Sequence, residues 1–210
     1  MSSQEKAKDS NGIFPMIKLG LILAAYAVAA CTVLAVVNNI TSPVIRRNQE
    51  EKANNAMRSV FAEADSFMAP EHTAIEGAGN ISIDSLQLAC KNGKVIGAVA
   101  QVTGPTYDTS TVMVGISLDG TITGVQYLSN TDTPGFGQKA SDPTFHLANG
   151  KTFYGQFEGK NAREGFVTGV TFDAISGATI TSDGAAALLT TATDSIMKVL
   201  ASYAGNGEVQ

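Results

Sequence analysis

A cluster of small hydroxyl side chains lies in residues 173–182, which read Asp-Ala-Ile-Ser-Gly-Ala-Thr-Ile-Thr-Ser. The preceding residues 167–172 predict a buried strand, Ser176-Gly177 predicts a tight turn, and the residues that follow predict a helix. Hydroxyl groups beside the unpaired backbone amides of a helix N-terminus form a ready site for a phosphate group. Ordinary helix capping by serine or threonine is the alternative interpretation of the same residues.

The helix after this cluster is predicted from the spacing of its apolar residues. Thr181 or Ser182 suits its N-cap, Asp183 suits its positive end, and Gly205 can supply a left-handed stop. One buried face at i, i+3, i+4 spacing is formed by Ala185, Leu188, Leu189, Ala192, Ile196, Val199, Leu200 and Tyr203. We therefore expect this helix to pack against a sheet.

The spacing Asp173-x-x-Ser176-Gly177-Ala178-Thr179 resembles the flavinylation motif of the extracytoplasmic FMN-binding domain at all seven positions. That domain occurs in the G subunit of the Rnf ferredoxin:NAD oxidoreductase and in the C subunit of the sodium-pumping NADH:quinone reductase. The resemblance implies that Thr179 carries FMN through a phosphoester bond. It implies further cofactor-binding residues at Asp173, Ser176, Gly177, Ala178, Thr181 and Ser182.

A second stretch, residues 131–139, reads Thr-Asp-Thr-Pro-Gly-Phe-Gly-Gln-Lys and predicts a rigid turn whose backbone can approach another molecule closely. It resembles the Glu-Thr-Pro-Gly-Leu-Gly loop of the same domain, which lies near the flavin. Asp132 replaces the longer glutamate, and Phe136 replaces the leucine and can still pack on the ring. The resemblance implies cofactor contacts from Thr133, Pro134, Gly135, Phe136, Gly137 and Lys139.

The chemistry of attachment points to a second protein. A threonine hydroxyl is a weak nucleophile, and no histidine lies within thirty residues of Thr179. We therefore expect an external flavin transferase to use FAD, displace AMP and leave FMN esterified. The sequence has no dinucleotide fingerprint and no catalytic acid–base pair, so we expect no catalytic residue and an electron relay.

Composition excludes several other classes of protein. A net charge of −5, a pI near 5.0 and the lack of a basic cluster argue against a nucleic-acid binder. The two cysteines and two histidines form no close group in the sequence. We therefore expect no metal site, iron–sulfur cluster or haem held by this chain alone.

Residues 19–37 form a charge-free apolar run between Lys18 and Arg46. About 20 helical residues span the roughly 30 Å core of a bilayer, so we expect one transmembrane helix over residues 18–41. Residues 28–31 also resemble a bacterial lipobox that would make Cys31 a lipid anchor, but the apolar run continues past it. The basic residues on the two sides nearly balance and do not set the orientation.

The segments on either side of this run complete the domain plan. Residues 1–17 form an N-terminal tail, of which 1–12 are expected to be disordered. Ser42-Pro43 resembles a helix start and predicts a linker helix within 42–79, with an apolar stripe to about residue 65. The resemblance implies an inner-membrane protein with a cytoplasmic tail and a C-terminal domain on the extracytoplasmic side.

Residues 80–205 are expected to form the FMN-binding domain. Strands at 86–89 and 95–102 flank a turn at 91–94, and strands at 112–118 and 121–128 flank Asp119-Gly120. These two hairpins predict a twisted antiparallel sheet. The fold class is therefore α+β, with one N-terminal transmembrane helix followed by a sheet packed against helices.

Three functional hypotheses follow. The first is a membrane-anchored electron-transfer subunit with covalent FMN in an ion-translocating ferredoxin:NAD oxidoreductase complex. For it, the resemblance implies partner membrane subunits, one of them also flavinylated, an NADH/ferredoxin module, and Na⁺ or H⁺ translocation. The second is the C subunit of the quinone reductase, which tends to be longer. The third is a membrane-anchored, non-redox binding or assembly domain in which residues 176–182 are only a capped turn.

Overall fold

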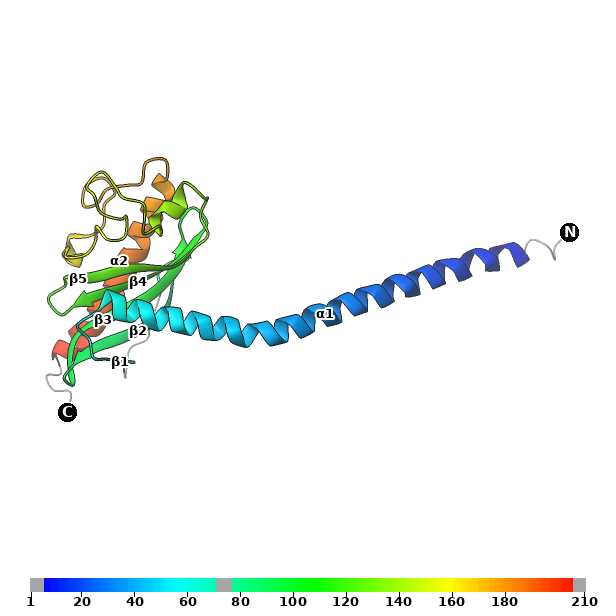
Figure 1. Cartoon of the computed structure of the whole chain (residues 1–210), viewed down its shortest axis with the longest axis horizontal. Coiled ribbons are helices and arrows are strands. Elements are labelled where there is room, and N and C mark those ends of the chain that lie inside the picture. The colour runs from blue at the N-terminus through cyan, green and yellow to red at the C-terminus, as the bar shows by residue number, and fades with distance from the viewer. Residues whose placement is uncertain (1–5, 71–76, 206–210) are drawn as a thin grey trace. The chain divides into compact units, whose positions relative to one another are not determined.

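The computed structural model describes residues 6–70 and 77–205, with side chains described from Phe14 onward and up to Tyr203. The chain divides into two compact units, residues 1–50 and 51–210. Helix α1 (Lys6–Val60) begins in the first unit and ends in the second, which contains all the strands and helix α2 (Thr179–Gly205) (Figure 1).

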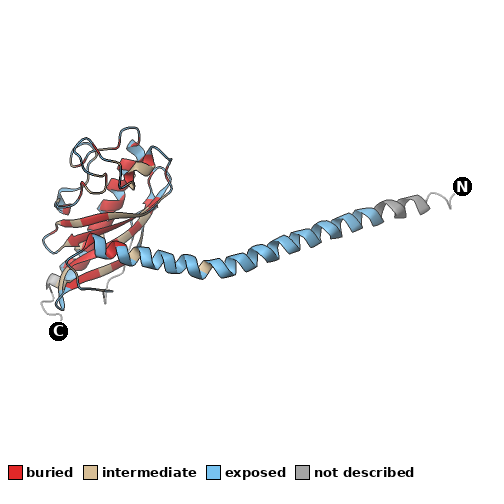
Figure 2. Cartoon of the chain, viewed as in Figure 1, coloured by how far each residue is buried: buried red, intermediate tan, exposed pale blue. Residues whose placement is uncertain are grey.

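The first unit is an apolar helix with an exposed surface. All side chains from Phe14 to Thr41 are exposed, as the pale blue ribbon of Figure 2 shows. Over Phe14–Val60 the mean hydropathy of the most apolar window reaches 2.4, and the helix is long enough to cross a bilayer. An apolar surface of this length is stable in lipid, so the unit agrees with the predicted single transmembrane helix.

Two predicted boundaries on α1 are wrong. The helix begins at Lys6, so the disorder expected for residues 1–12 does not hold for 6–12, while 1–5 lie outside the described residues. The new helix expected at Ser42-Pro43 is instead the continuation of α1, with Pro43 in its interior. Proline removes one backbone donor, but the turns on both sides maintain the helix. The Ser42 hydroxyl donates to the Asn38 carbonyl, 2.7 Å away, rather than capping a new helix.

The second unit is built on a five-stranded antiparallel sheet in the order β1-β2-β3-β4-β5. The strands are β1 (Ser66–Met68), β2 (Ser82–Lys91), β3 (Lys94–Pro105), β4 (Thr109–Ser117) and β5 (Ile122–Asn130). The structure confirms both predicted hairpins, β2-β3 and β4-β5, with longer strands than the sequence indicated. The short edge strand β1 was not predicted.

Helix α2 covers one face of this sheet. Small and branched side chains of β3 and β4, such as Ala98, Ala100 and Val114, pack against its apolar stripe in the main hydrophobic core. Of the predicted stripe on α2, seven side chains are buried and Tyr203 is partly buried. The helical spacing therefore identified the buried face correctly. Helix α2 runs to Gly205, the last residue that the structure describes, so the left-handed stop expected there stays a prediction.

The last turns of α1 cover the other face. Ala56, Met57, Val60 and Phe61 form a second core with residues of β2, β3 and β4. Because side chains alternate along a strand, Val99 points into this core while its neighbours Ala98 and Ala100 point into the first. The predicted apolar stripe leads into this packing, although the helix ends at Val60 rather than near residue 65.

Glycines let the end of α1 lie directly on the sheet. A Cβ atom at Gly124 would lie 2.9 Å from the Val60 Cα, and one at Gly97 would lie 2.6 Å from the Phe61 ring. Gly115, which pairs with Gly124 across β4 and β5, is equally crowded by Val60. The Thr123 hydroxyl donates to the Val60 carbonyl at 2.5 Å and satisfies an otherwise unpaired acceptor at the helix C-terminus.

Between β5 and α2 the chain is mostly irregular. The described residues contain two short 3-10 helices here, η1 (Gly137–Ala140) and η2 (Ala162–Glu164). A cluster of aromatic rings holds the region together, with Phe157 contacting Phe153, Phe166 and Phe172 at centroid distances of 5.1 to 5.9 Å.

The strand predicted at residues 167–172 is wrong. Hydrogen bonds from the amides of Val170 and Thr171 to the Val167 carbonyl close a turn, and Gly169 has φ of +73°. Val170 is 79% exposed. The composition suited a buried strand, but the turn occupies the backbone donors that a sheet partner would need.

The packing of α1 on the glycines gives the first prediction. Gly124→Val should lower the free energy of unfolding of the second unit by roughly 1–3 kcal/mol, because the new side chain must displace Val60. Thermal and denaturant unfolding of the full chain in detergent would measure this change. Ser129→Val, at an exposed position of the same strand, is the matched control and should have little effect. Equal stability of the two variants would contradict the packing argument.

Candidate functional site

A buried carboxylate lies at the end of β5. Asp132 is fully buried, and its Oδ1 accepts from the Thr106 hydroxyl at 2.6 Å and from the Asp108 amide at 2.8 Å. Its Oδ2 accepts from the Thr181 hydroxyl at 2.7 Å. The carboxylate therefore joins the turn after β3, the loop after β5 and the first turn of α2.

The surroundings of Asp132 keep it ionised. Burial alone raises the pKa of the carboxyl group. The hydroxyls of Thr106 and Thr181 and the amides of Asp108 and Tyr107 act in the opposite direction, and the pKa ends below its ordinary value. The protein thus holds a negative charge in its interior through hydrogen bonds.

Two glycines allow the segments around this carboxylate to meet. A Cβ atom at Gly137 would lie 2.5 Å from the Thr181 hydroxyl and 2.6 Å from the Asp132 Cβ. A Cβ atom at Gly184 would lie 2.6 Å from the Thr106 Cα. Only glycine lets η1 and the turn after β3 approach the beginning of α2 this closely.

An open cavity of about 420 Å³ lies over this junction, within the range typical of small-molecule sites (about 300–1,000 Å³). Its lining comes from the turn after β3, the loop 131–139 and the start of α2. None of the nine lining residues is charged. They are Tyr107, Thr133, Phe136, Gly137, Gly177, Ala178, Thr179, Ile180 and Thr181.

The hydroxyl groups of the predicted cluster divide into two kinds. Ser182 is fully buried, and its hydroxyl accepts from the Ile175 amide and donates to the Ala178 carbonyl. Thr181 is also buried and bonds to Asp132. Ser176 and Thr179 are exposed, and of these two only Thr179 lines the cavity. Of the predicted cluster, Thr179 is therefore the residue that is both exposed and part of the cavity lining.

The start of α2 differs from the prediction. The helix begins at Thr179, and its first i to i−4 bond runs from the Ser182 amide to the Ala178 carbonyl. Thr181 and Ser182 lie inside the first turn, so neither is the N-cap that the sequence suggested. By helix geometry the amides of the first three residues, 179–181, have no partner within the helix, and all three residues line the cavity.

Asp173 lies at a different hollow. Its exposed carboxylate accepts from the Asn149 amide at 2.8 Å, and its backbone forms two hydrogen bonds with the side chain of buried Gln156. Lys151 and Lys160 line the same hollow. The structure therefore does not bring Asp173 into the lining of the cavity beside Thr179.

The loop 131–139 is brought to the cavity as a unit, but its residues are placed differently. Thr133, Phe136 and Gly137 line the cavity, whereas Pro134 and Gly135 are exposed outside the lining. The Lys139 ammonium lies over the Phe145 ring, 5.2 Å from its centroid.

Three contributors to the site were not predicted. Tyr107 and Ile180 are 63% and 60% exposed, and together with Phe136 they give the cavity an apolar and aromatic rim. Thr106 lies in the turn after β3 and was not predicted to contribute to the site. Its role is evident only from its hydrogen bonds to Asp132 and Ser110.

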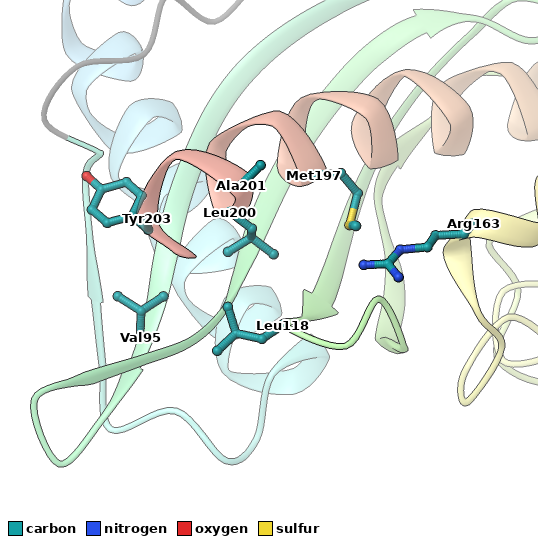
Figure 3. Close-up of a pocket in the computed structure, with 7 residues that line it drawn as sticks. All are labelled: Val95, Leu118, Arg163, Met197, Leu200, Ala201 and Tyr203. Atoms are coloured by element: carbon teal, nitrogen blue, oxygen red, sulfur yellow. The ribbon is translucent and has the colours of Figure 1, made fainter. Parts of the chain in front are cut away.

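A second hollow, of about 290 Å³, lies at the C-terminal end of α2 (Figure 3). Its lining is mostly apolar, with the side chains of Leu118, Met197 and Leu200 and the guanidinium of Arg163. Residues 179 and 197 are about 27 Å apart along an ideal helix. This hollow is therefore separate from the hydroxyl cluster.

Two known protein families match parts of this chain, and their boundaries agree with the cavity and with the end of α1. Residues 106–194 match the FMN-binding domain family, and this range contains Thr106, Asp132 and the whole cavity lining. Residues 11–60 match the RnfG N-terminal region. That match ends at the residue where α1 ends.

Several curated proteins are similar over most of the chain. The G subunit of the Na⁺-translocating ferredoxin:NAD⁺ oxidoreductase complex of Acetobacterium woodii is 32% identical, over 87% of this chain and 91% of that protein. The G subunit of the ion-translocating oxidoreductase complex of Methanosarcina acetivorans is 28% identical, over 89% and 95%. The G subunit of the proton-translocating ferredoxin:NAD⁺ oxidoreductase complex of Clostridium ljungdahlii is 28% identical, over 75% and 74%.

The hydrogen bonds of Asp132 give the second prediction. Asp132→Ala should lower the free energy of unfolding by about 2 kcal/mol or more, because it leaves buried hydroxyls without an acceptor. Asp132→Asn keeps an acceptor oxygen and should cost less. Denaturant unfolding would measure both, with Asp108→Ala as a control that removes an exposed carboxylate. An alanine variant as stable as the control would contradict the structural role of Asp132.

Proposed function

This chain belongs to the family of Rnf-complex G subunits, and from this premise we propose that it carries FMN covalently on Thr179. As a member of this family it is a membrane-anchored electron-transfer subunit of an oxidoreductase complex. The proposal adds the attachment residue, the covalent bond and the side of the membrane on which the flavin domain lies.

The observation that carries the proposal is the position of the Thr179 hydroxyl. It is exposed, it lies at the first residue of α2 and it borders the cavity. Thr181 and Ser182 use their hydroxyls inside the protein. Within residues 179–182, only Thr179 thus combines access for a modifying enzyme with a place beside the cavity.

The residues around Thr179 suit both ends of FMN. A phosphate esterified to Thr179 would lie beside the amides at the helix start, which favour negative charge. The exposed rings of Tyr107 and Phe136 and the side chain of Ile180 would contact the apolar isoalloxazine. A phosphodiester keeps a single negative charge, which fits a lining without lysine or arginine.

Attachment requires a group transfer from FAD. In the proposed step the Thr179 oxygen forms a bond to the phosphorus on the FMN side of FAD, and the bond between that phosphorus and the oxygen bridging the two phosphates breaks. AMP leaves, and the hydroxyl proton passes to a base of an external flavin transferase. The small residues Gly177 and Ala178 beside Thr179 leave room for that enzyme to reach the hydroxyl.

When bound, FMN supplies the redox chemistry, and the protein supplies position and electrostatics. The relatives' names describe ferredoxin:NAD⁺ oxidoreductase complexes that translocate ions. We propose the same setting here, with electron exchange through other membrane subunits, one of them a second flavoprotein with covalent FMN. If the domain lies outside the cytoplasm, a covalent bond keeps the flavin from diffusing away.

The alternative of a quinone reductase C subunit has less support. The match over residues 11–60 is to the RnfG N-terminal region, and the three relatives named above are all G subunits. The further alternative, a domain without a redox role, is decided by the first of the two experiments below.

The third prediction concerns Thr179. Full-length protein made together with a flavin transferase should show flavin fluorescence in its band after denaturation and electrophoresis. Thr179→Ala should lose this signal entirely, because Thr179 occupies the attachment position of the motif; the other exposed hydroxyls of the lining, those of Tyr107 and Thr133, lie outside the motif. Intact-mass measurement should show the addition of FMN less one water in the wild type only.

Ser176→Ala is the matched control, since it removes an exposed hydroxyl three residues away. This variant should fold normally, and its intact mass should show that the remaining hydroxyl at Thr179 still carries FMN. Flavin that persists in Thr179→Ala, or its absence from native wild-type protein, would refute the proposal.

The fourth prediction concerns the side of the membrane. Ser129→Cys places a thiol at an exposed position of β5, whereas the native Cys90 is buried and Cys31 lies in the apolar run. A membrane-impermeant maleimide should label this variant in intact cells. Ser10→Cys, in the N-terminal tail, should be labelled only after lysis. The reverse pattern would place the flavin domain in the cytoplasm.

A further inference from the structure

The charge of Asp132 is not neutralised by any of the groups that bond to its carboxylate. The donors are the hydroxyls of Thr106 and Thr181 and the amide of Asp108, all of which are neutral. Hydrogen bonds of this kind stabilise the ionised form without removing its net charge. A full negative charge therefore remains on a side chain that has no solvent-exposed surface.

This charge lies directly behind the cavity wall. Thr181 and Gly137 both line the cavity, and both touch Asp132 on their other side. The Thr181 hydroxyl is 2.7 Å from Oδ2, and a Cβ atom at Gly137 would lie 2.8 Å from the same oxygen. A ligand in contact with this wall is separated from the carboxylate by one layer of protein atoms.

We propose that Asp132 makes the reduction potential of the flavin in this cavity more negative than it would be without that charge. This inference rests on the proposed function, because it concerns the flavin attached at Thr179. Two-electron reduction of a flavin with uptake of one proton from solvent adds one negative charge to the ring. A nearby buried carboxylate repels that charge and disfavours the reduced form, and the repulsion is strong because little water screens it.

A second buried group responds to the same charge. The Tyr127 hydroxyl is buried and has no hydrogen-bond partner among the described residues. Burial raises the pKa of this phenol, and the negative charge of Asp132 raises it further. The electrostatic influence of Asp132 thus extends beyond the atoms bonded to it, as an effect on the flavin requires.

The test is an equilibrium redox titration of full-length, flavinylated protein at pH 8, followed by the visible absorbance of the flavin. Asp132→Asn removes the charge with little change of shape. Its midpoint potential should shift in the positive direction, by an amount that favours the reduced form roughly tenfold or more. An unchanged or more negative potential would overturn the inference.

Two matched variants separate charge from packing. Thr181→Val breaks a hydrogen bond at the same wall but keeps the Asp132 charge, so its potential should not shift positively. Asp108→Asn removes an exposed charge nearby, and solvent screening should keep its shift much smaller than that of Asp132→Asn. A positive shift of Thr181→Val as large as that of Asp132→Asn would attribute the effect to packing and overturn the inference.

If Asp132→Asn does not fold, the Thr181→Val measurement still tests the inference. A positive shift that favours the reduced form roughly tenfold or more in this variant, which keeps the Asp132 charge, would overturn it. Failure of the proposed function would look different. In that case wild-type protein would carry no covalent flavin and the denaturing gel would show no fluorescence. If the wild-type protein carries covalent flavin but Asp132→Asn has the same midpoint potential as the wild type, only the tuning role of Asp132 is refuted.

Discussion

The hydrogen bonds of one buried carboxylate fix the geometry of the whole cavity. Asp132 joins Thr106, 26 residues before it in the chain, and Thr181, 49 residues after it. Ordering segments so far apart costs conformational entropy, and bonds to an ionised acceptor are about twice as strong as neutral ones. Because those bonds lie beneath the cavity floor, the loop 131–139 and the start of α2 are placed relative to each other before any ligand binds.

This arrangement explains the residue types of the hydroxyl cluster. Thr181 and Ser182 stabilise the turn and the first helical residues from inside, so Thr179 can remain exposed without loss of order. Gly177 has φ of +80°, and a Cβ atom there would lie 3.4 Å from the Phe136 ring. Stabilising the helix start and offering an exposed hydroxyl, which the sequence presented as alternative interpretations, are thus roles of different neighbouring residues.

The sequence was most informative where periodicity or turn chemistry was strong. The two hairpins and the buried face of α2 followed from alternation, turn residues and helical spacing. The strand predicted at residues 167–172 was wrong because valine, threonine and phenylalanine suit a strand. The turn that these residues form depends on Gly169 and on long-range packing. The helix start predicted at Ser42-Pro43 was wrong because a proline within a long helix has the same local pattern as a helix start.

The site could be predicted only in part, for a similar reason. The motif pointed to Thr179, and the loop 131–139 pointed to Phe136 and Gly137, which the structure places together at the cavity. Asp132 was noted only as a shorter replacement for glutamate, because nothing in a lone acidic residue of a loop reveals that it is buried. Tyr107 and Ile180 gave no signal either, since exposure of an apolar side chain is a property of the fold.

The neutral lining of the cavity is itself an argument about how the flavin is held. A flavin bound without a covalent bond would present a phosphate with nearly two negative charges, which proteins usually bind with arginine or lysine. This cavity offers backbone amides and apolar side chains instead, and it stands over a buried negative charge. Such a site would hold a free FMN weakly. The covalent ester proposed at Thr179 would remove the need for affinity, so the residues around the ring would be free to set its potential.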